Sequence, residues 1–166
     1  DWRDLLEYFV LGLDAKVKRI DIAIDDFDGN IVTFDWILDK LNRDDYSSCF
    51  KNRNFNLSGH INTGRSITFG KHGKTLMLCI YEKLKEQQSK KIECNQTYWT
   101  RFEMRFSQNR GDDFSFNFLK NSEIEFKEYV MNVFYNMLDI KDDDNDRNHN
   151  NISHAQTDKK WLEFLN

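Results

Sequence analysis

The sequence contains no proline among its 166 residues, so no turn or helix end can be placed by that residue. It has three cysteines, Cys49, Cys79 and Cys94, an odd number without paired spacing. Their pattern argues against a disulfide framework or a zinc site and predicts reduced thiols in a cytoplasmic protein. No apolar run approaches the ~20 residues of a membrane span, and no signal peptide opens the chain, so we expect no membrane contact. Because the first residue is Asp1 and not methionine, we expect a fragment of a longer protein.

An excess of basic residues is also missing. Lys and Arg number 24 against 28 Asp and Glu, which gives a formal net charge of −4 and an isoelectric point of 5.6. Nucleic-acid-binding domains often carry a basic balance, so the overall charge gives no sign of DNA. A local basic patch can nevertheless coexist with an acidic tail. The length suits one domain, and an aromatic content of 14% supplies bulky residues for its core.

Three segments alternate apolar and polar residues, which predicts β-strands. They are Arg19–Asp26, Leu76–Lys83 and Tyr98–Ser107. We predict that these strands lie side by side, with their apolar residues against a core. Their outer faces would then bring acids, arginines and a tyrosine onto one sheet surface. Arg65–Gly70 is expected to form a hairpin with the second of these strands.

Apolar residues at helical spacing predict helices at both ends of the chain. A helix over Trp2–Leu13 is expected to pack on the sheet, and Thr33 is expected to cap a helix over Phe34–Asn42. The other expected elements are a short strand around Phe50–Leu57, a short exposed helix between Glu82 and Lys91, a helix capped by Asp112 or Asp113 that runs to Leu119, and a helix over Glu123–Leu138. The predicted fold class is α+β, an antiparallel β-sheet core flanked by helices.

The composition divides the chain into three parts. Residues 1–140 carry the predicted sheet and helices and form one domain. Residues 141–157 are rich in Asp, Asn and His with little to bury, which predicts a mobile polar linker. Residues 158–166 carry Trp161 and two leucines at helical spacing and are expected to form a terminal helix that docks or begins a further segment.

Acidic residues on the predicted outer faces form a set of hard oxygen ligands. Asp21 and Asp25 lie on one strand, opposite Glu103 on another. Mg²⁺ and Mn²⁺ take such ligands, and a bound ion would polarise a phosphodiester. Tyr81 could then attack phosphorus, with Lys83 on the same face to lower the pKa of the phenol or to hold a phosphate. The same pattern also fits solvated cross-strand ion pairs and a tyrosine that only packs.

Basic and aromatic residues near these strands are candidates for binding the phosphates and bases of DNA. They are Arg19, Arg65, Lys71, Lys74, Trp99, Arg101 and Arg105.

Four motifs appear in one order along the chain, at Arg19–Asp26, Ser66–Lys71, Leu78–Lys83 and Trp99–Arg105. Together they resemble the replication initiation factor family of the Rep_trans type. This family contains the initiators of certain rolling-circle plasmids and related relaxases of integrative conjugative elements. The resemblance covers about Arg19 to Phe106 and implies a divergent HUH-nickase-like fold, although no clear HUH motif is present.

The resemblance also implies roles for individual residues. The family's nucleophile, in a Tyr-acid-Lys motif, falls on Tyr81, and its metal-binding acids fall on Asp21 or Asp25, or both, and on Glu103. The chain departs from the family pattern in two places. The lead-in to Tyr81 has no arginine, and the loop Gly70–Lys74 is short, which puts the usual DNA contacts of that loop in doubt.

The resemblance implies that the protein initiates rolling-circle replication. Residues 1–140 would be its nicking domain. Such an enzyme nicks one DNA strand at the origin, leaves a 5′-phosphotyrosine and a free 3′-OH, and rejoins strands at termination with a divalent Mg²⁺ or Mn²⁺ ion. The expected partner is single-stranded or extruded origin DNA, with a homodimer and a host helicase open as further partners. A conjugative relaxase, a hydrolytic metal nuclease and a non-catalytic DNA-binding module are the alternatives.

Overall fold

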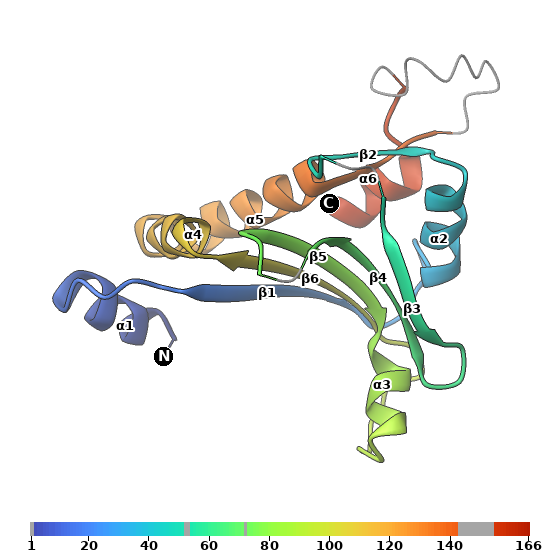
Figure 1. The fold of residues 1–166 in the computed structure, drawn as a ribbon, viewed down its shortest axis with the longest axis horizontal. Helices are drawn as coiled ribbons and strands as arrows, with labels where there is room; N and C mark the ends of the chain where they lie inside the picture. The colour runs from blue at the N-terminus through green and yellow to red at the C-terminus, as the bar shows by residue number, and fades with distance from the viewer. Residues whose placement is uncertain (1, 52–53, 72, 143–154) are drawn as a thin grey trace.

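The computed structural model describes residues 2–51, 54–71, 73–142 and 155–166. Its centre is a five-stranded antiparallel sheet with the strand order β1-β6-β5-β4-β3 (Figure 1). The strands are β1 (Arg19–Asp26), β3 (Asn56–His60), β4 (Gly64–Gly70), β5 (Leu76–Glu82) and β6 (Thr100–Ser107). The three strands predicted from their alternating sequences therefore do lie side by side, and the predicted hairpin joins β4 to β5.

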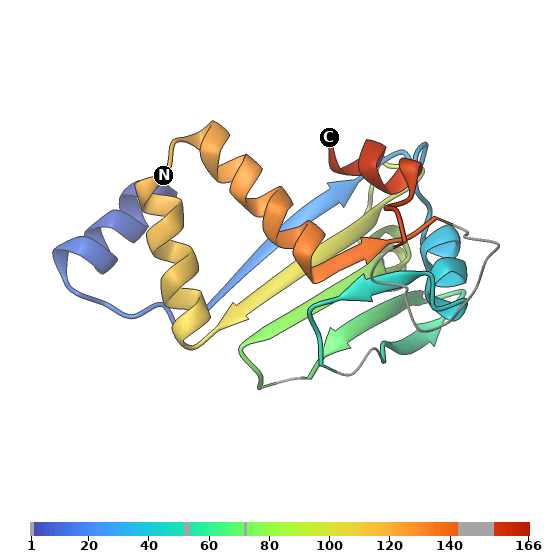
Figure 2. The same cartoon turned by 90° about the horizontal axis from the view of Figure 1, so that it is seen from above.

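Helices cover one face of this sheet. Over it lie α4 (Asn109–Lys120), α5 (Glu123–Met137), α6 (Lys159–Leu165) and a small sheet of β2 (Tyr46–Ser48) and β7 (Leu138–Ile140), with α2 (Phe34–Asn42) beside them (Figures 1 and 2). Within the described part of the chain, no helix lies over the opposite face, which we call the open face. The helix α3 (Lys83–Ser89) extends from one end of the sheet. The predicted α+β class is confirmed.

The core lies between the helices and the inner face of the sheet. Alternate residues of β6, including Phe102 and Met104, are fully buried there. Phe134 of α5 and Trp161 of α6 pack against Phe102, with ring centroids 5.6 and 6.4 Å away. The alternation of β6 thus places its apolar residues under the helices and leaves its charged residues on the open face.

Side-chain caps explain where two predicted helices begin. The Thr33 hydroxyl accepts a hydrogen bond from the backbone N–H of Trp36 at 3.1 Å, at the start of α2. Ser122 and Glu125 form a reciprocal capping box at the start of α5. Both helices agree with the sequence prediction within one or two residues.

The N-terminal helix was predicted over Trp2–Leu13, which agrees with the helical stretch Trp2–Gly12, but its predicted packing was wrong. Helix α1 (Trp2–Glu7) passes into a π-helical turn η1 (Tyr8–Gly12), and α1 lies beside α4, not on the sheet. Arg3 fixes it there, because its guanidinium donates to the carbonyl oxygens of Leu119 and Asn121 at 2.9 and 2.7 Å. Most apolar side chains of this helix stay exposed to solvent, and Trp2 is 78% exposed. Periodicity predicted the helix, but it could not identify the surface against which the helix packs.

Two predicted boundaries were wrong. The strand expected around Phe50–Leu57 begins only at Asn56, because Phe50 and Phe55 serve as core side chains against Phe69, with ring centroids 5.7 and 6.1 Å away. Helix α4 begins at Asn109, so Asp112 is not its cap. The Asp112 carboxylate instead accepts a hydrogen bond from the backbone N–H of Val17 at 3.0 Å.

The predicted polar linker lies mostly outside the described residues, because positions 143–154 fall there. At its two ends, Lys141 and Thr157 form an antiparallel bridge, and Lys141 is buried. The strands β2 and β7, which the sequence analysis did not predict, lead into this bridge. None of the helices in the described residues is long and apolar enough to span a lipid bilayer.

Candidate active site

Strand β5 presents Tyr81 on the open face, opposite Arg101 of β6 and Ser66 of β4. The Tyr81 hydroxyl donates a hydrogen bond to Oε2 of Glu103 at 3.2 Å. Partial burial and the negative charge of Glu103 raise the pKa of Tyr81 above its ordinary value. The phenol is therefore protonated at neutral pH, with a carboxylate in place to accept its proton.

Lys83 supplies a positive charge beside this phenol. It is the first residue of α3, and its Nζ lies 2.7 Å from Oε2 of Glu86. The same ammonium group lies 5.6 Å from the centre of the Tyr81 ring and 5.9 Å from that of Trp99. Its side chain is only 13% exposed, so the charge is held in a partly desolvated position where it acts more strongly than in water.

Two carboxylates of β1 are paired with arginines of β6. Asp25 accepts hydrogen bonds from Nε and Nη2 of Arg101, both at 2.7 Å. These bonds outweigh the effect of partial burial and lower the pKa of Asp25. Asp21 accepts from Arg19 at 2.8 Å and from Arg105 at 3.3 Å. The strand register explains both pairs, because Asp25 faces Arg101 and Asp21 faces Arg105 across the ladder.

The family model for replication initiation factors, Rep_trans, matches residues 15–166. The chain belongs to this family. The resemblance inferred from the four sequence motifs is therefore confirmed, and the match extends well beyond the region that those motifs cover. No curated protein matches the chain.

A solved structure, the rolling circle replication initiator protein from Geobacillus stearothermophilus, matches this replication initiation factor with a TM-score of 0.79 at 20% sequence identity. The match covers 99% of this chain and 60% of that one, so this chain spans about 60% of the length of that initiator. At this identity the likeness establishes a common fold.

The three acids predicted as metal ligands share the open face but do not converge. Glu103 lies opposite Ala23, between Asp21 and Asp25, whose Cα atoms are separated by roughly 13 Å along the strand. Glu103 already accepts a hydrogen bond from Arg105 at 3.0 Å, besides that from Tyr81. Within the described residues, no three Asp, Glu, His or Cys side chains form a group able to hold a metal ion. The donor type suits Mg²⁺ or Mn²⁺, but the arginine-paired arrangement does not fit such an ion.

A cavity of about 300 Å³ adjoins Tyr81 on the open face. It is lined by Tyr81, Glu103, Glu86 and neighbouring residues of β4 and β5. Glu86 was not among the predicted site residues, although it lies one helical turn after Lys83 in the sequence, and that spacing is the signal that could have identified it. Through its contact with Lys83, Glu86 positions the ammonium group beside the phenol.

The predicted DNA-binding cations fall into two groups. Arg65 is engaged within the protein, since it donates to Glu82 at 2.9 Å and to Asp35 at 2.7 Å, and its side chain is 15% exposed. Lys71 and Lys74 are exposed in the turn between β4 and β5. Lys71 also borders a cavity of about 600 Å³ on the open face. The structure thus leaves the turn lysines open to a ligand and encloses Arg65.

An aromatic pair lies at the end of β6 near this site. Trp99 donates from its indole N–H to Asp25 at 2.7 Å, and the Phe27 ring centre lies 5.3 Å from that of Trp99. Trp99 was predicted as a DNA contact, whereas Phe27 was not. The sequence signal for Phe27 was weak, because a single aromatic residue in a turn is commonly a packing residue.

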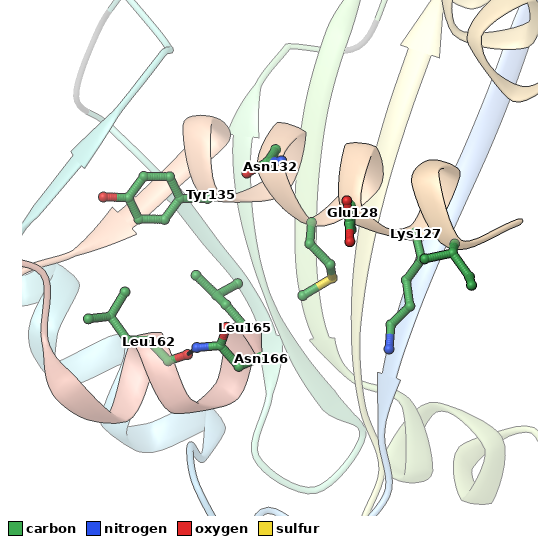
Figure 3. Close-up of a pocket in the computed structure, with 9 residues that line it drawn as sticks. Lys127, Glu128, Asn132, Tyr135, Leu162, Leu165 and Asn166 are labelled. Atoms are coloured by element: carbon green, nitrogen blue, oxygen red, sulfur yellow. Dashed lines mark hydrogen bonds between the residues drawn. The ribbon is translucent and has the colours of Figure 1, made fainter. Parts of the chain in front are cut away.

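Another cavity lies elsewhere, between α5 and α6, and has a volume of about 690 Å³ (Figure 3). Its walls carry Tyr135, Leu162 and Leu165, with Lys127 and Glu128 toward one end. None of the predicted site residues lines it. It lies between two helices of the helical layer, whereas the strand register places Tyr81 on the open face.

Proposed function

We propose that this chain nicks one strand of DNA at a replication origin and rejoins strands at termination, with Tyr81 as the nucleophile. The observation that supports this most directly is the hydrogen bond between Tyr81 and Glu103 on the open face of a replication initiation factor. A hydroxyl with an attached proton acceptor and a neighbouring cation is the arrangement that nucleophilic catalysis requires.

In the proposed reaction Glu103 accepts the proton of Tyr81 as general base. The phenolate oxygen forms a bond to phosphorus while the bond from phosphorus to the 3′ oxygen breaks. The products are a 5′-phosphotyrosine on Tyr81 and a 3′ oxygen that takes up a proton, which gives a free 3′-OH. Glu103 then returns its proton to water. The reverse sequence, with an attacking 3′-OH, rejoins the strand.

Cations around Tyr81 would stabilise the negative charge that grows on the phosphate oxygens. Lys83 is the nearest, and Arg101 and Arg105 lie on the same face, where a phosphate would share their guanidinium groups with Asp25, Asp21 and Glu103. Arg19, Lys71 and Lys74 are proposed to hold the flanking phosphates. We propose a structural role for Arg65, because Ser66, its neighbour on β4, pairs with Tyr81, and the Arg65 side chain therefore points away from the open face, toward Glu82.

A requirement for Mg²⁺ or Mn²⁺, with Asp21, Asp25 and Glu103 as ligands, stays a prediction from the resemblance. Because the carboxylates are paired with arginines, the proposed steps use the chain's own residues alone. Single-stranded or extruded origin DNA is the proposed substrate, since the regular backbone of a duplex would reach a phenol on a sheet face only with difficulty. A homodimer, a host helicase and a cytoplasmic location also stay predictions.

The decisive experiment incubates the protein with single-stranded oligonucleotides that include the origin of its own replicon, in the presence of Mn²⁺. We expect a covalent protein–DNA band on a denaturing gel with the wild type and none with Tyr81→Phe. Tyr8→Phe is the matched control, because Tyr8 is an exposed tyrosine on η1, outside the sheet that carries Tyr81, and it should give the wild-type band. A parallel reaction with a chelator tests the predicted ion.

Each other outcome points to a different function. Cleavage that survives Tyr81→Phe would overturn the proposal and favour a hydrolytic nuclease. Binding of every strand without cleavage would leave a DNA-binding module. An adduct that persists in the chelator would overturn the predicted metal ion and leave Tyr81 as the nucleophile.

A further inference from the structure

Phe27 is a large apolar side chain that the fold leaves partly in water. It lies in the turn after β1, and 48% of its surface is exposed. The turn that carries it is well fixed, because the Asp26 carboxylate accepts hydrogen bonds from the backbone N–H groups of Asp28 and Gly29 at 3.2 and 3.1 Å. Gly29 has a φ of +65°, and the ring of Tyr98 occupies the place of a Cβ there. The exposed ring is therefore held in a defined position.

Trp99 forms the other half of an aromatic surface with Phe27. The two ring centres are 5.3 Å apart with an interplanar angle of 41°. Trp99 is itself fixed by the hydrogen bond from its indole N–H to Asp25. Two held rings lose little conformational freedom when a ligand stacks on them, which favours binding.

Two cations lie beside Trp99 of this aromatic pair, Arg101, which is paired with Asp25, and Lys83, which is paired with Glu86. The guanidinium carbon of Arg101 lies 5.4 Å from the Trp99 ring centre, and the Lys83 ammonium lies 5.9 Å from it. Aromatic rings interleaved with cations are the surface that single-stranded nucleic acids select, because the bases stack while the phosphates pair with the charges.

The same Lys83 ammonium lies close to both aromatic sites, 5.6 Å from the Tyr81 ring centre and 5.9 Å from that of Trp99. The Lys83 ammonium thus connects the phenol with the aromatic pair of Trp99 and Phe27. A phosphate beside Tyr81 and Lys83 would place the adjoining nucleotide over Trp99 and Phe27.

We propose that Phe27 and Trp99 form a stacking platform for one unpaired nucleobase, next to the phosphate held at Tyr81 and Lys83. This inference rests on the proposed function for the identity of that phosphate. The platform selects a base that has left the duplex, since a paired base has its faces covered by its neighbours. Its contribution is to affinity and to the register of the strand, not to proton transfer.

The test compares two fluorescein-labelled strands by anisotropy. One is an oligothymidylate of about 15 nucleotides, and the other has the same backbone with abasic residues throughout. We expect the wild type to bind the strand with bases about tenfold more tightly than the abasic strand. Phe27→Leu, which keeps the apolar bulk and removes the ring, should lose most of that preference and bind the abasic strand as the wild type does. Phe27→Tyr should keep it.

Phe116→Leu is the matched control, because Phe116 is an exposed phenylalanine on α4, 50% exposed and outside the proposed site. It should bind both strands as the wild type does. Equal preference in Phe27→Leu and the wild type would overturn the platform, as would a wild type that does not prefer bases or binds neither strand. These outcomes are separate from the covalent reaction: base preference without an adduct overturns the nicking proposal alone, and an adduct without base preference overturns the platform alone.

Discussion

At the scale of single residues, the side chains of the motif Tyr81, Glu82 and Lys83 point in two different directions. Tyr81 and Lys83 point to the open face, whereas Glu82 is buried between β4 and α3. Glu82 accepts hydrogen bonds from Nε of Arg65 at 2.9 Å and from Nζ of Lys85 at 2.7 Å. The acidic residue of the motif therefore holds together the elements on which Tyr81 and Lys83 lie.

The pKa of Glu82 provides a test of this role. Burial opposes its ionisation, but the hydrogen bonds from Arg65 and Lys85 outweigh burial and lower the pKa from 4.5 to about 2. A lowered folded-state pKa adds stability that is full above the unfolded value of 4.5 and is lost as the pH falls toward 2. We expect Glu82→Gln to reduce the free energy of unfolding at pH 7 by about 2 kcal/mol, a figure that allows for partial exposure.

Urea denaturation of Glu82→Gln and the wild type at pH 7 and at about pH 3 measures this difference. The gap between them should narrow at the lower pH. Asp35→Asn is the matched control, because Asp35 contacts the same Arg65 but its side chain is 74% exposed, and it should change stability by less than about 0.5 kcal/mol. Equal urea midpoints for Glu82→Gln and the wild type at pH 7 would contradict the proposal that Glu82 holds these elements together.

At the scale of elements, the approach of α4 to the start of the sheet depends on a glycine. Gly111 lies in the first turn of α4 and is buried. A Cβ placed on it would lie 2.8 Å from the carbonyl oxygen of Val17 and 3.4 Å from that of Phe106. Both obstacles are backbone atoms, which cannot rotate away as a flexible side chain would. The absent side chain allows α4 to contact the residues that lead into β1 and out of β6.

Gly111→Ala should therefore destabilise the protein, although alanine is the better helix former. We expect the steric cost to exceed the gain in helix propensity and to lower the free energy of unfolding by about 1 kcal/mol or more. Gly12→Ala is the matched control, since the nearest atom to its added Cβ would be a side-chain carbon of Tyr8 at 3.9 Å, an ordinary contact. Thermal unfolding of both variants checks this, and a Gly111→Ala variant more stable than the wild type would refute it.

At the scale of the whole molecule, the terminal helix α6 belongs to the central core. Trp161 is fully buried, and its indole N–H donates to the carbonyl oxygen of Leu138 at 3.2 Å. The Asp158 carboxylate, which caps α6, forms an enclosed ion pair with Lys40 of α2 at 2.8 Å. We therefore propose that the nicking domain extends beyond residue 140 and includes α6.

Trp161→Ala tests the contribution of α6 to the fold. Truncation of a fully buried tryptophan typically costs about 3–5 kcal/mol, a large part of the stability of a single domain. We expect a large drop in the midpoint of urea denaturation. Leu162→Ala on the same helix is the matched control, because Leu162 is 42% exposed and should cost far less. A small effect of Trp161→Ala would mean that α6 contributes little to the folded domain.

The sequence by itself determined the elements that depend on the spacing of apolar residues within one segment and on helix caps. Alternation placed β1, β5 and β6 and assigned Tyr81, Asp25 and Glu103 to one face, because a strand turns successive side chains to opposite sides. Helical spacing located α2 and α5, and the Thr33 cap located the start of α2, because both signals depend only on neighbouring residues. Four motifs in order identified the family, which the match over residues 15–166 confirms.

Only the tertiary structure decided which side chains meet. The pattern put three acids on one surface, but the register set each β1 acid opposite an arginine, so the acids pair with cations and do not gather around one point. The same applies to Glu82 with Arg65, to Phe27 with Trp99 and to α1 with α4. Such contacts join segments far apart in the chain, and their geometry follows from strand register and helix docking, which periodicity within one segment does not contain.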